Sequence, residues 1–189
     1  MASVSAYLLV RGREVALVDT GTPLSDAEIG AGLKAAGLGW DAVRHVIITH
    51  NHTDHGGGWE SVEPHVRAKA YAGDADAGSI PAREPVSTAK DGDEIFGLRI
   101  VATPGHTLGH LSVFDPATGV LVAGDALRTE GGPLSGSNPD YTYDPTAAAA
   151  SVVKLAALDP KVVLVGHGNP LETGAAAALR SLAAHPAPS

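Results

Sequence analysis

Three histidines and one aspartate lie within six consecutive positions, in the stretch THNHTDHGG that spans residues 49–57. His50 and His52 are two residues apart, so in extended backbone both imidazoles point to the same side. Neutral imidazole nitrogens bind borderline divalent metals at about 2.0–2.1 Å. Asp54 and His55 follow after a turn and could face a second metal. This spacing favours a metal site over a surface loop that happens to be rich in histidine.

Three further candidates follow apolar runs elsewhere in the chain. His106 stands in TPGHTLGH, Asp125 in VLVAGD and His167 in VLVGHG. Strand ends are rigid and can aim several side chains at one point, as a preorganised site requires. A carboxylate can bridge two cations about 3.5–4 Å apart, which makes Asp125 a candidate bridge.

The elements that must position these residues can be predicted from local pattern. Two apolar runs, 6–10 and 15–18, predict a hairpin with Gly12 in its turn. Further strands are expected over 45–49, near 66–72, in 95–106 as a hairpin, over 111–115 and 119–125, and from 161 to 167. We therefore expect the buried strand at 45–49 to run directly into the histidine-rich stretch.

Helices are expected between and after these strands. The segment 25–37 predicts a helix with Ser25 as N-cap, Glu28 completing a capping box and Gly37 as its stop. A short helix should follow the glycines 56–58, and Asp144 with Pro145 should begin an Ala-rich helix. A last helix is expected over 173–184, and residues 131–143 read as a loop rich in Gly, Pro and Ser.

Composition limits the function classes. The 189 residues carry a net charge of −8, with no cysteine, and fit one domain over 1–189. No basic stripe is present, so nucleic acid is not an expected partner. No apolar stretch approaches the roughly 18 residues of a membrane span, and the N-terminus lacks a signal-peptide pattern. We expect a cytoplasmic protein that acts on a small molecule, of unknown oligomeric state.

Five ordered motifs together resemble the metallo-β-lactamase-fold hydrolases, in the glyoxalase II-like branch. They are LVDTG, THNHTDH, TPGHTLGH, AGDAL and VGHG, and the resemblance spans residues 4 to about 170. It implies an α/β (α+β) fold, the four-layer αββα sandwich, with a dinuclear site at one edge of the sheets. Two divalent ions are implied, zinc before iron or manganese.

The resemblance also assigns roles residue by residue. It implies that the first metal is bound by His50, His52 and His106, the second by Asp54, His55 and His167, with Asp125 between them. Asp19 would orient the histidine stretch, and His110 would support the ligands rather than bind. Asp54 could also be catalytic, by orienting the attacking hydroxide.

The chemistry expected of such a site is hydrolysis of a small ester, thioester, lactone or amide by a metal-bridging hydroxide. The glyoxalase II-like enzymes use an additional C-terminal helical region for glutathione, and we expect a different substrate because this chain ends soon after His167. The alternatives are a mononuclear iron dioxygenase, similar to persulfide dioxygenases, or a β-lactamase on the same scaffold.

Three residues are candidates for substrate contact. Arg128 replaces the tyrosine that the related lactonases carry three residues after the bridging aspartate, and it could pair with a substrate carboxylate or simply lie on the surface. Tyr141 and Tyr143 could line the pocket from the loop 131–143, although exposed loop tyrosines are the default interpretation.

Overall fold

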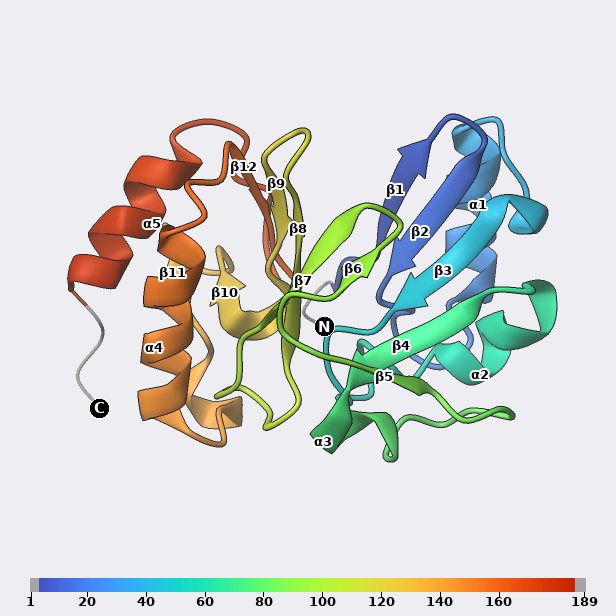
Figure 1. Cartoon of the computed structure of the whole chain (residues 1–189), viewed down its shortest axis with the longest axis horizontal. Coiled ribbons are helices and arrows are strands. Elements are labelled where there is room, and N and C mark those ends of the chain that lie inside the picture. The colour runs from blue at the N-terminus through green and yellow to red at the C-terminus, as the bar shows by residue number, and fades with distance from the viewer. Residues whose placement is uncertain (1–3, 186–189) are drawn as a thin grey trace.

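The chain folds into two sheets that face each other, each covered on its outer side by helices (Figure 1). The computed structural model describes residues 4–185. The first sheet has the order β1 to β5: Tyr7–Arg11, Glu14–Val18, Val43–Ile47, Lys69–Gly73 and Ser87–Ala89. The β1–β2 pair is an antiparallel hairpin, and β2 to β5 run parallel to one another.

The second sheet has the order β12-β9-β8-β7-β6. These strands are Val162–Leu164, Val120–Val122, Leu111–Asp115, Leu98–Ala102 and Glu94–Ile95. A separate short pair, β10 (Leu127–Arg128) and β11 (Ser135–Gly136), lies beside it.

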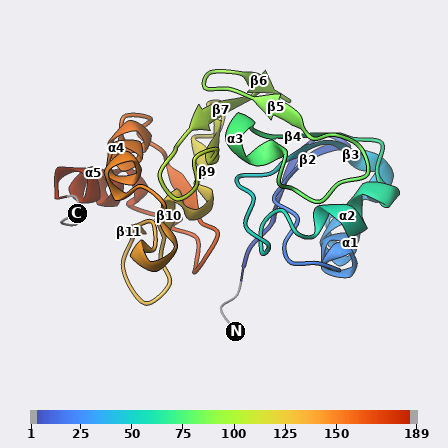
Figure 2. The same cartoon turned by 90° about the horizontal axis from the view of Figure 1, so that it is seen from below.

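Helices cover the outer face of each sheet, as Figure 1 shows. On the first sheet these are α1 (Asp26–Ala35) and α2 (Trp59–Val62), and on the second α4 (Pro145–Ala156) and α5 (Ala175–Ala184). The short α3 (Asp74–Ala77) follows β4 and lies next to the second half of the molecule (Figure 2). None of the helices within residues 4–185 is long and apolar enough to cross a membrane.

Alternation along the strands produces three apolar layers. On β2, Val15 and Leu17 pack toward α1, whereas Ala16 and Val18 pack between the two sheets. A third cluster, with Leu155 and Leu179 as members, fills the space between the second sheet and its helices. The four-layer αββα prediction is confirmed.

The parallel strands of the first sheet all end at the edge where the candidate functional residues lie. Asp19 follows β2, His50 comes soon after β3, and Asp76 lies in α3 directly after β4. Ligand sites in open α/β sheets form at the carboxyl ends of the strands. The polar residues after these strands therefore meet at one edge.

Most local predictions hold, and one is wrong. The hairpin, the strand before the histidine-rich stretch and the Asp144 cap of α4 are all present. The capping box at Ser25 does not form, because its hydroxyl contacts Thr22 Oγ1 instead of capping α1. The sequence pattern did not predict β5, α3 or the β10–β11 pair.

Candidate metal centre

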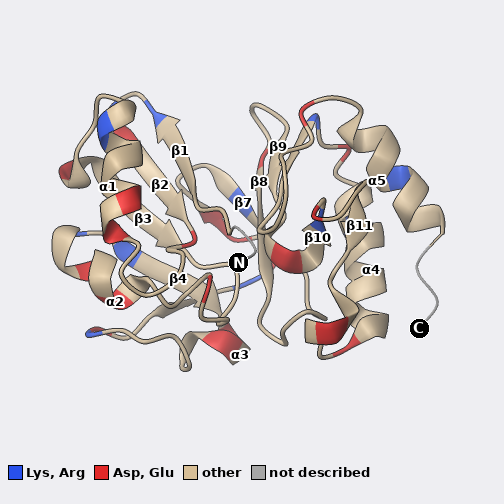
Figure 3. Ribbon diagram, turned by 180° about the vertical axis from the view of Figure 1, so that it is seen from behind, with Lys and Arg blue, Asp and Glu red and all other residues tan. Residues whose placement is uncertain are grey.

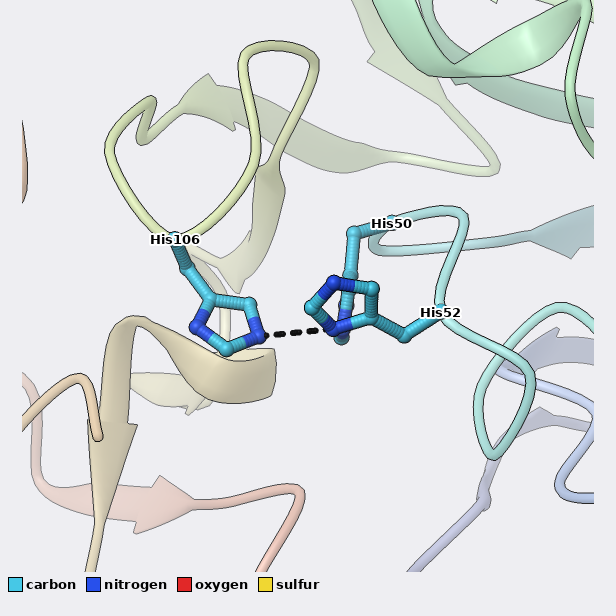
Figure 4. A group of neighbouring side chains, drawn as sticks. All are labelled: His50, His52 and His106. Atoms are coloured by element: carbon cyan, nitrogen blue, oxygen red, sulfur yellow. Dashed lines mark hydrogen bonds between the residues drawn. The ribbon is translucent and has the colours of Figure 1, made fainter. Parts of the chain in front are cut away.

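The first group of potential ligands joins the two halves of the fold. His50 and His52 come from the loop after β3, and His106 comes from the loop between β7 and β8 (Figure 4). Nδ1 of His52 lies 3.0 Å from Nε2 of His106, and the ring centroids of His50 and His106 are 4.8 Å apart. The three side chains offer nitrogens that all lie within 4.8 Å of one another.

The second group consists of Asp54, His55 and His167, whose ligand atoms meet the same limit. Nε2 of His167 is 3.2 Å from Oδ2 of Asp54 and 3.5 Å from Nε2 of His55. His55 is buried, whereas the side chain of Asp54 is 40% exposed. This group is the more open of the two.

Asp125 lies between the two groups. Its Oδ1 is 3.3 Å from Nε2 of His55, and its Oδ2 is 3.4 Å from Nε2 of both His106 and His167. One carboxylate therefore reaches histidines of both groups, in the place that a bridging ligand would need. The structure brings together all seven residues that the sequence predicted as ligands.

Asp19 supports two of these histidines from behind. It accepts hydrogen bonds from Nδ1 of His55 at 2.9 Å and from the backbone and hydroxyl of Thr49 at 2.7 and 2.9 Å. Because the Thr49 hydroxyl donates to Asp19, its oxygen accepts from Nδ1 of His50 at 3.0 Å. Both imidazoles thus carry their proton on Nδ1 and present Nε2 to the cluster.

His110 holds the backbone of Asp125. The Asp125 N–H donates to Nε2 of His110 at 3.1 Å, so Nδ1–H of His110 donates to the hydroxyl of Thr103 at 2.8 Å. That hydroxyl in turn contacts Ser112 Oγ at 2.9 Å. His110 therefore has both nitrogens engaged away from the cluster, which fits the supporting role predicted for it.

Burial and the carboxylates set the charge states of the centre. Burial lowers the pKa of His50 well below its usual value, and lowers the pKa of His106 to about 4. Burial would also lower the pKa of His55, but Asp19 and Asp125 outweigh it and raise that pKa to about 10. Burial opposes ionisation of Asp125, yet the neighbouring imidazoles of His167 and His55 bring its pKa below the usual range. His50 and His106 are therefore neutral, the form in which imidazole binds cations.

A buried orphan atom tests whether the residues fit a metal. Nε2 of His50 is fully buried and has no hydrogen-bond partner. Nearly all buried polar atoms are paired, so an unpaired one calls for an explanation. A cation among these nitrogens and carboxylate oxygens would satisfy it, and the donor set suits a divalent metal. The residues fit.

Asp76 is a functional candidate that the sequence did not single out. Its Oδ2 accepts from the backbone of Asn51 at 3.2 Å and from the Thr107 hydroxyl at 2.6 Å, and its Oδ1 accepts from the backbone of Gly109 at 3.0 Å. The side chain is buried. It therefore ties the loop of His50 and His52 to the loop of His106.

Gly166 is a second residue of this kind. A Cβ at this position would collide with Oδ1 of Asp125 and would lie 2.6 Å from Cε1 of His55. The only signal in the sequence was its place directly before His167. The backbone at Gly166 therefore packs directly against the centre, and a side chain at this position would displace Asp125 and His55.

An open cavity of about 470 Å³ adjoins His52 and His106. Tyr141 and Tyr143 line it and are exposed, and a substrate contact of these tyrosines stays a prediction. Arg128 is not among the residues that line this cavity; it is partly buried in β10, and its carbonyl accepts from the Ser135 hydroxyl at 3.4 Å. A substrate contact of Arg128 stays a prediction.

Comparison with known proteins gives consistent matches. The family model described as "Metallo-beta-lactamase superfamily" matches residues 2–167. The probable metallo-hydrolase YflN of Bacillus subtilis (strain 168) is 30% identical, with 82% of this chain and 75% of that protein covered. A hydroxyacylglutathione hydrolase of Ectopseudomonas mendocina (strain ymp) is 38% identical over 77% of this chain, which spans only 53% of that enzyme.

A solved structure of similar size also matches. The protein TTHA1623, in a di-iron-bound form, has a TM-score of 0.73 and 26% identity. The match covers 90% of this chain and 93% of that one.

Proposed function

The chain belongs to the metallo-β-lactamase superfamily and is a metal-dependent hydrolase, and we propose that it holds two divalent cations and cleaves a small ester, thioester, lactone or amide. The observation that supports two cations is the position of Asp125, whose two oxygens face histidines of both groups. Zinc is the first candidate metal. Iron is the alternative, because the similar TTHA1623 has a di-iron form.

The proposed ligands form two sets. His50, His52 and His106 would hold one cation and Asp54, His55 and His167 the other. Asp125 would contact both, because it groups with His50 of the first set and His55 of the second. When bound, such cations supply Lewis acidity and make water acidic enough to lose a proton near neutral pH.

Other residues of the chain orient the proposed ligands and the attacking water. Asp19 keeps the Nδ1 proton of His55 in place, and the Thr49 hydroxyl does the same for His50. His110 fixes the backbone of Asp125. Asp54 is proposed to orient the attacking water through a carboxylate oxygen, because its side chain is the most exposed carboxylate of the cluster.

Thioesters are the first substrate class to test, since hydroxyacylglutathione hydrolases are among the relatives. The chain covers about half of those enzymes, so glutathione itself is not part of the proposal. Metal-depleted protein should be reconstituted separately with zinc, iron(II) and manganese. Each form is then assayed with matched esters, thioesters, lactones and a β-lactam. We expect hydrolysis of at least one acyl class that returns only with metal, and metal-independent activity or none in every form would refute the proposal.

A further inference from the structure

The cavity beside the metal centre has an apolar wall that is exposed to solvent. Leu108, Tyr141 and Tyr143 line it, and their exposed fractions are 58%, 67% and 74%. Within residues 4–185 six large apolar side chains are exposed, and three of them gather here. Exposed apolar patches of this kind mark binding surfaces.

The backbone at Tyr143 is tied to the loop that carries His106. The backbone N–H of Tyr143 donates to the carbonyl of His106 at 3.2 Å, and that of Asp144 donates to the carbonyl of Gly105 at 2.9 Å. Leu108 belongs to the same loop as His106. The apolar wall therefore adjoins the loop that carries a proposed ligand, and a group bound there would lie beside the metal centre.

Apart from the histidines, the charged side chains that line this cavity are acidic. Its lining includes the carboxylates of Asp76 and Asp140 but no lysine or arginine. Asp76 is occupied by its three hydrogen bonds, whereas Asp140 is exposed. Figure 3 shows acidic and no basic segments on α3 and on the stretch directly before α4, the two segments beside the cavity. A negatively charged substrate group that lies against Asp140 would meet repulsion there, and the lining has no lysine or arginine to offset it.

We propose that this cavity selects substrates whose group remote from the reacting bond is apolar, preferably aromatic, and uncharged or cationic. Leu108, Tyr141 and Tyr143 bind that group, and Asp140 discriminates against a carboxylate. This inference rests on the proposed hydrolase function and names the substrate class for the same site. Discrimination of this kind comes from a repulsive contact as well as from attractive ones.

The test compares three thioesters of one thiol that differ only at the para position of a 3-phenylpropanoyl group: methyl, aminomethyl or carboxylate. With metal-loaded protein, kcat/KM should be at least about tenfold higher for the methyl and aminomethyl forms than for the carboxylate, equivalent to about 1.4 kcal/mol. Asp140→Lys should remove most of this difference. Asp41→Lys is the matched control, because Asp41 is exposed before β3, at the end of that strand opposite to the centre, and should leave the difference unchanged.

The aromatic wall is tested separately. Tyr141→Ala and Tyr143→Ala should raise KM for the methyl-substituted thioester about five- to tenfold and leave kcat and the acetyl thioester nearly unaffected, as expected for lost ground-state binding. Equal losses for the acetyl and aromatic thioesters would contradict binding by the wall.

Uncleavable thioether analogues with the same three groups separate this inference from the proposed function. Their dissociation constants, measured by calorimetry, should follow the same order even if none of the thioesters is cleaved. Tightest binding of the carboxylate analogue would overturn the inference. If the carboxylate analogue bound most tightly to the unaltered protein but not to Arg128→Ala, Arg128 would be the residue that binds its carboxylate.

Discussion

The carboxylate of Asp19 accepts a hydrogen bond from Nδ1–H of His55, with 2.9 Å between Nδ1 and Oδ2, and both side chains are almost completely buried. Asp19 adopts a left-handed backbone conformation, with φ of 63°, to place this carboxylate behind the histidine loop. The same carboxylate also accepts a hydrogen bond from the Thr49 hydroxyl, whose oxygen accepts one from Nδ1 of His50. One buried residue therefore orients a ligand from each proposed metal group.

Asp19→Asn should weaken metal binding without unfolding the chain. Asparagine tolerates the left-handed conformation, so the backbone is preserved, but the charge that holds His55 and Thr49 is lost. We expect affinity to fall about 10- to 100-fold, the usual effect of losing a residue that orients a ligand. Competition with a chromophoric chelator measures it. Asp41→Asn serves as the surface control, and an unchanged affinity in Asp19→Asn would contradict this role.

Asp76→Ala should lower both stability and the affinity of the first metal group. The substitution leaves the backbone N–H groups of Asn51 and Gly109 without their acceptor. Buried donors left unpaired cost roughly 1–3 kcal/mol in the free energy of unfolding, which urea denaturation measures. Thr107→Val removes only the 2.6 Å hydroxyl contact and should have a smaller effect on both quantities. An Asp76→Ala protein with normal stability and metal content would show that the carboxylate does not join the loops.

Gly166→Ala should abolish metal binding, because the added methyl occupies the space of the Asp125 carboxylate and the His55 ring. Elemental analysis of the purified variant checks this. Gly32→Ala is the matched control, since its new methyl would lie at an ordinary 3.5 Å from Leu8 Cδ1. A Gly166→Ala variant that retains full metal content would mean that the ligands lie elsewhere.

Asp125→Ala should lose both metals and hydrolytic activity together while circular dichroism stays that of the folded chain. The expectation follows from the position of its two oxygens between the histidine groups. Retention of one metal at full affinity would assign Asp125 to a single group rather than to both.

The metal centre could be predicted from sequence because its signals are local. The spacing of His50, His52 and His55 is unusual in itself, and the other candidates each follow an apolar strand. Strands that run in the same direction end at the same edge of a sheet, so residues that follow them come close together even when they are far apart in the sequence.

Asp76 could not be found in the same way. It stands in the segment DADA, which resembles a solvated polar turn, and its hydrogen-bond partners lie 25 to 33 residues away. The failed cap at Ser25 has a similar origin. The capping-box pattern considers only residues that follow Ser25, whereas the competing hydroxyl belongs to Thr22, which precedes it. Strands of two or three residues, such as β10 and β11, are too short to show a period.

The number of metal ions bound per chain tests the proposed dinuclear centre. Metal-depleted protein is titrated with zinc and, anaerobically, with iron(II), and the bound metal per chain is measured by elemental analysis after removal of excess ion. Hydrolysis of the best acyl substrate is followed on the same samples. We expect two metals per chain, with activity that rises as they bind. At most one metal per chain under saturating conditions would contradict it.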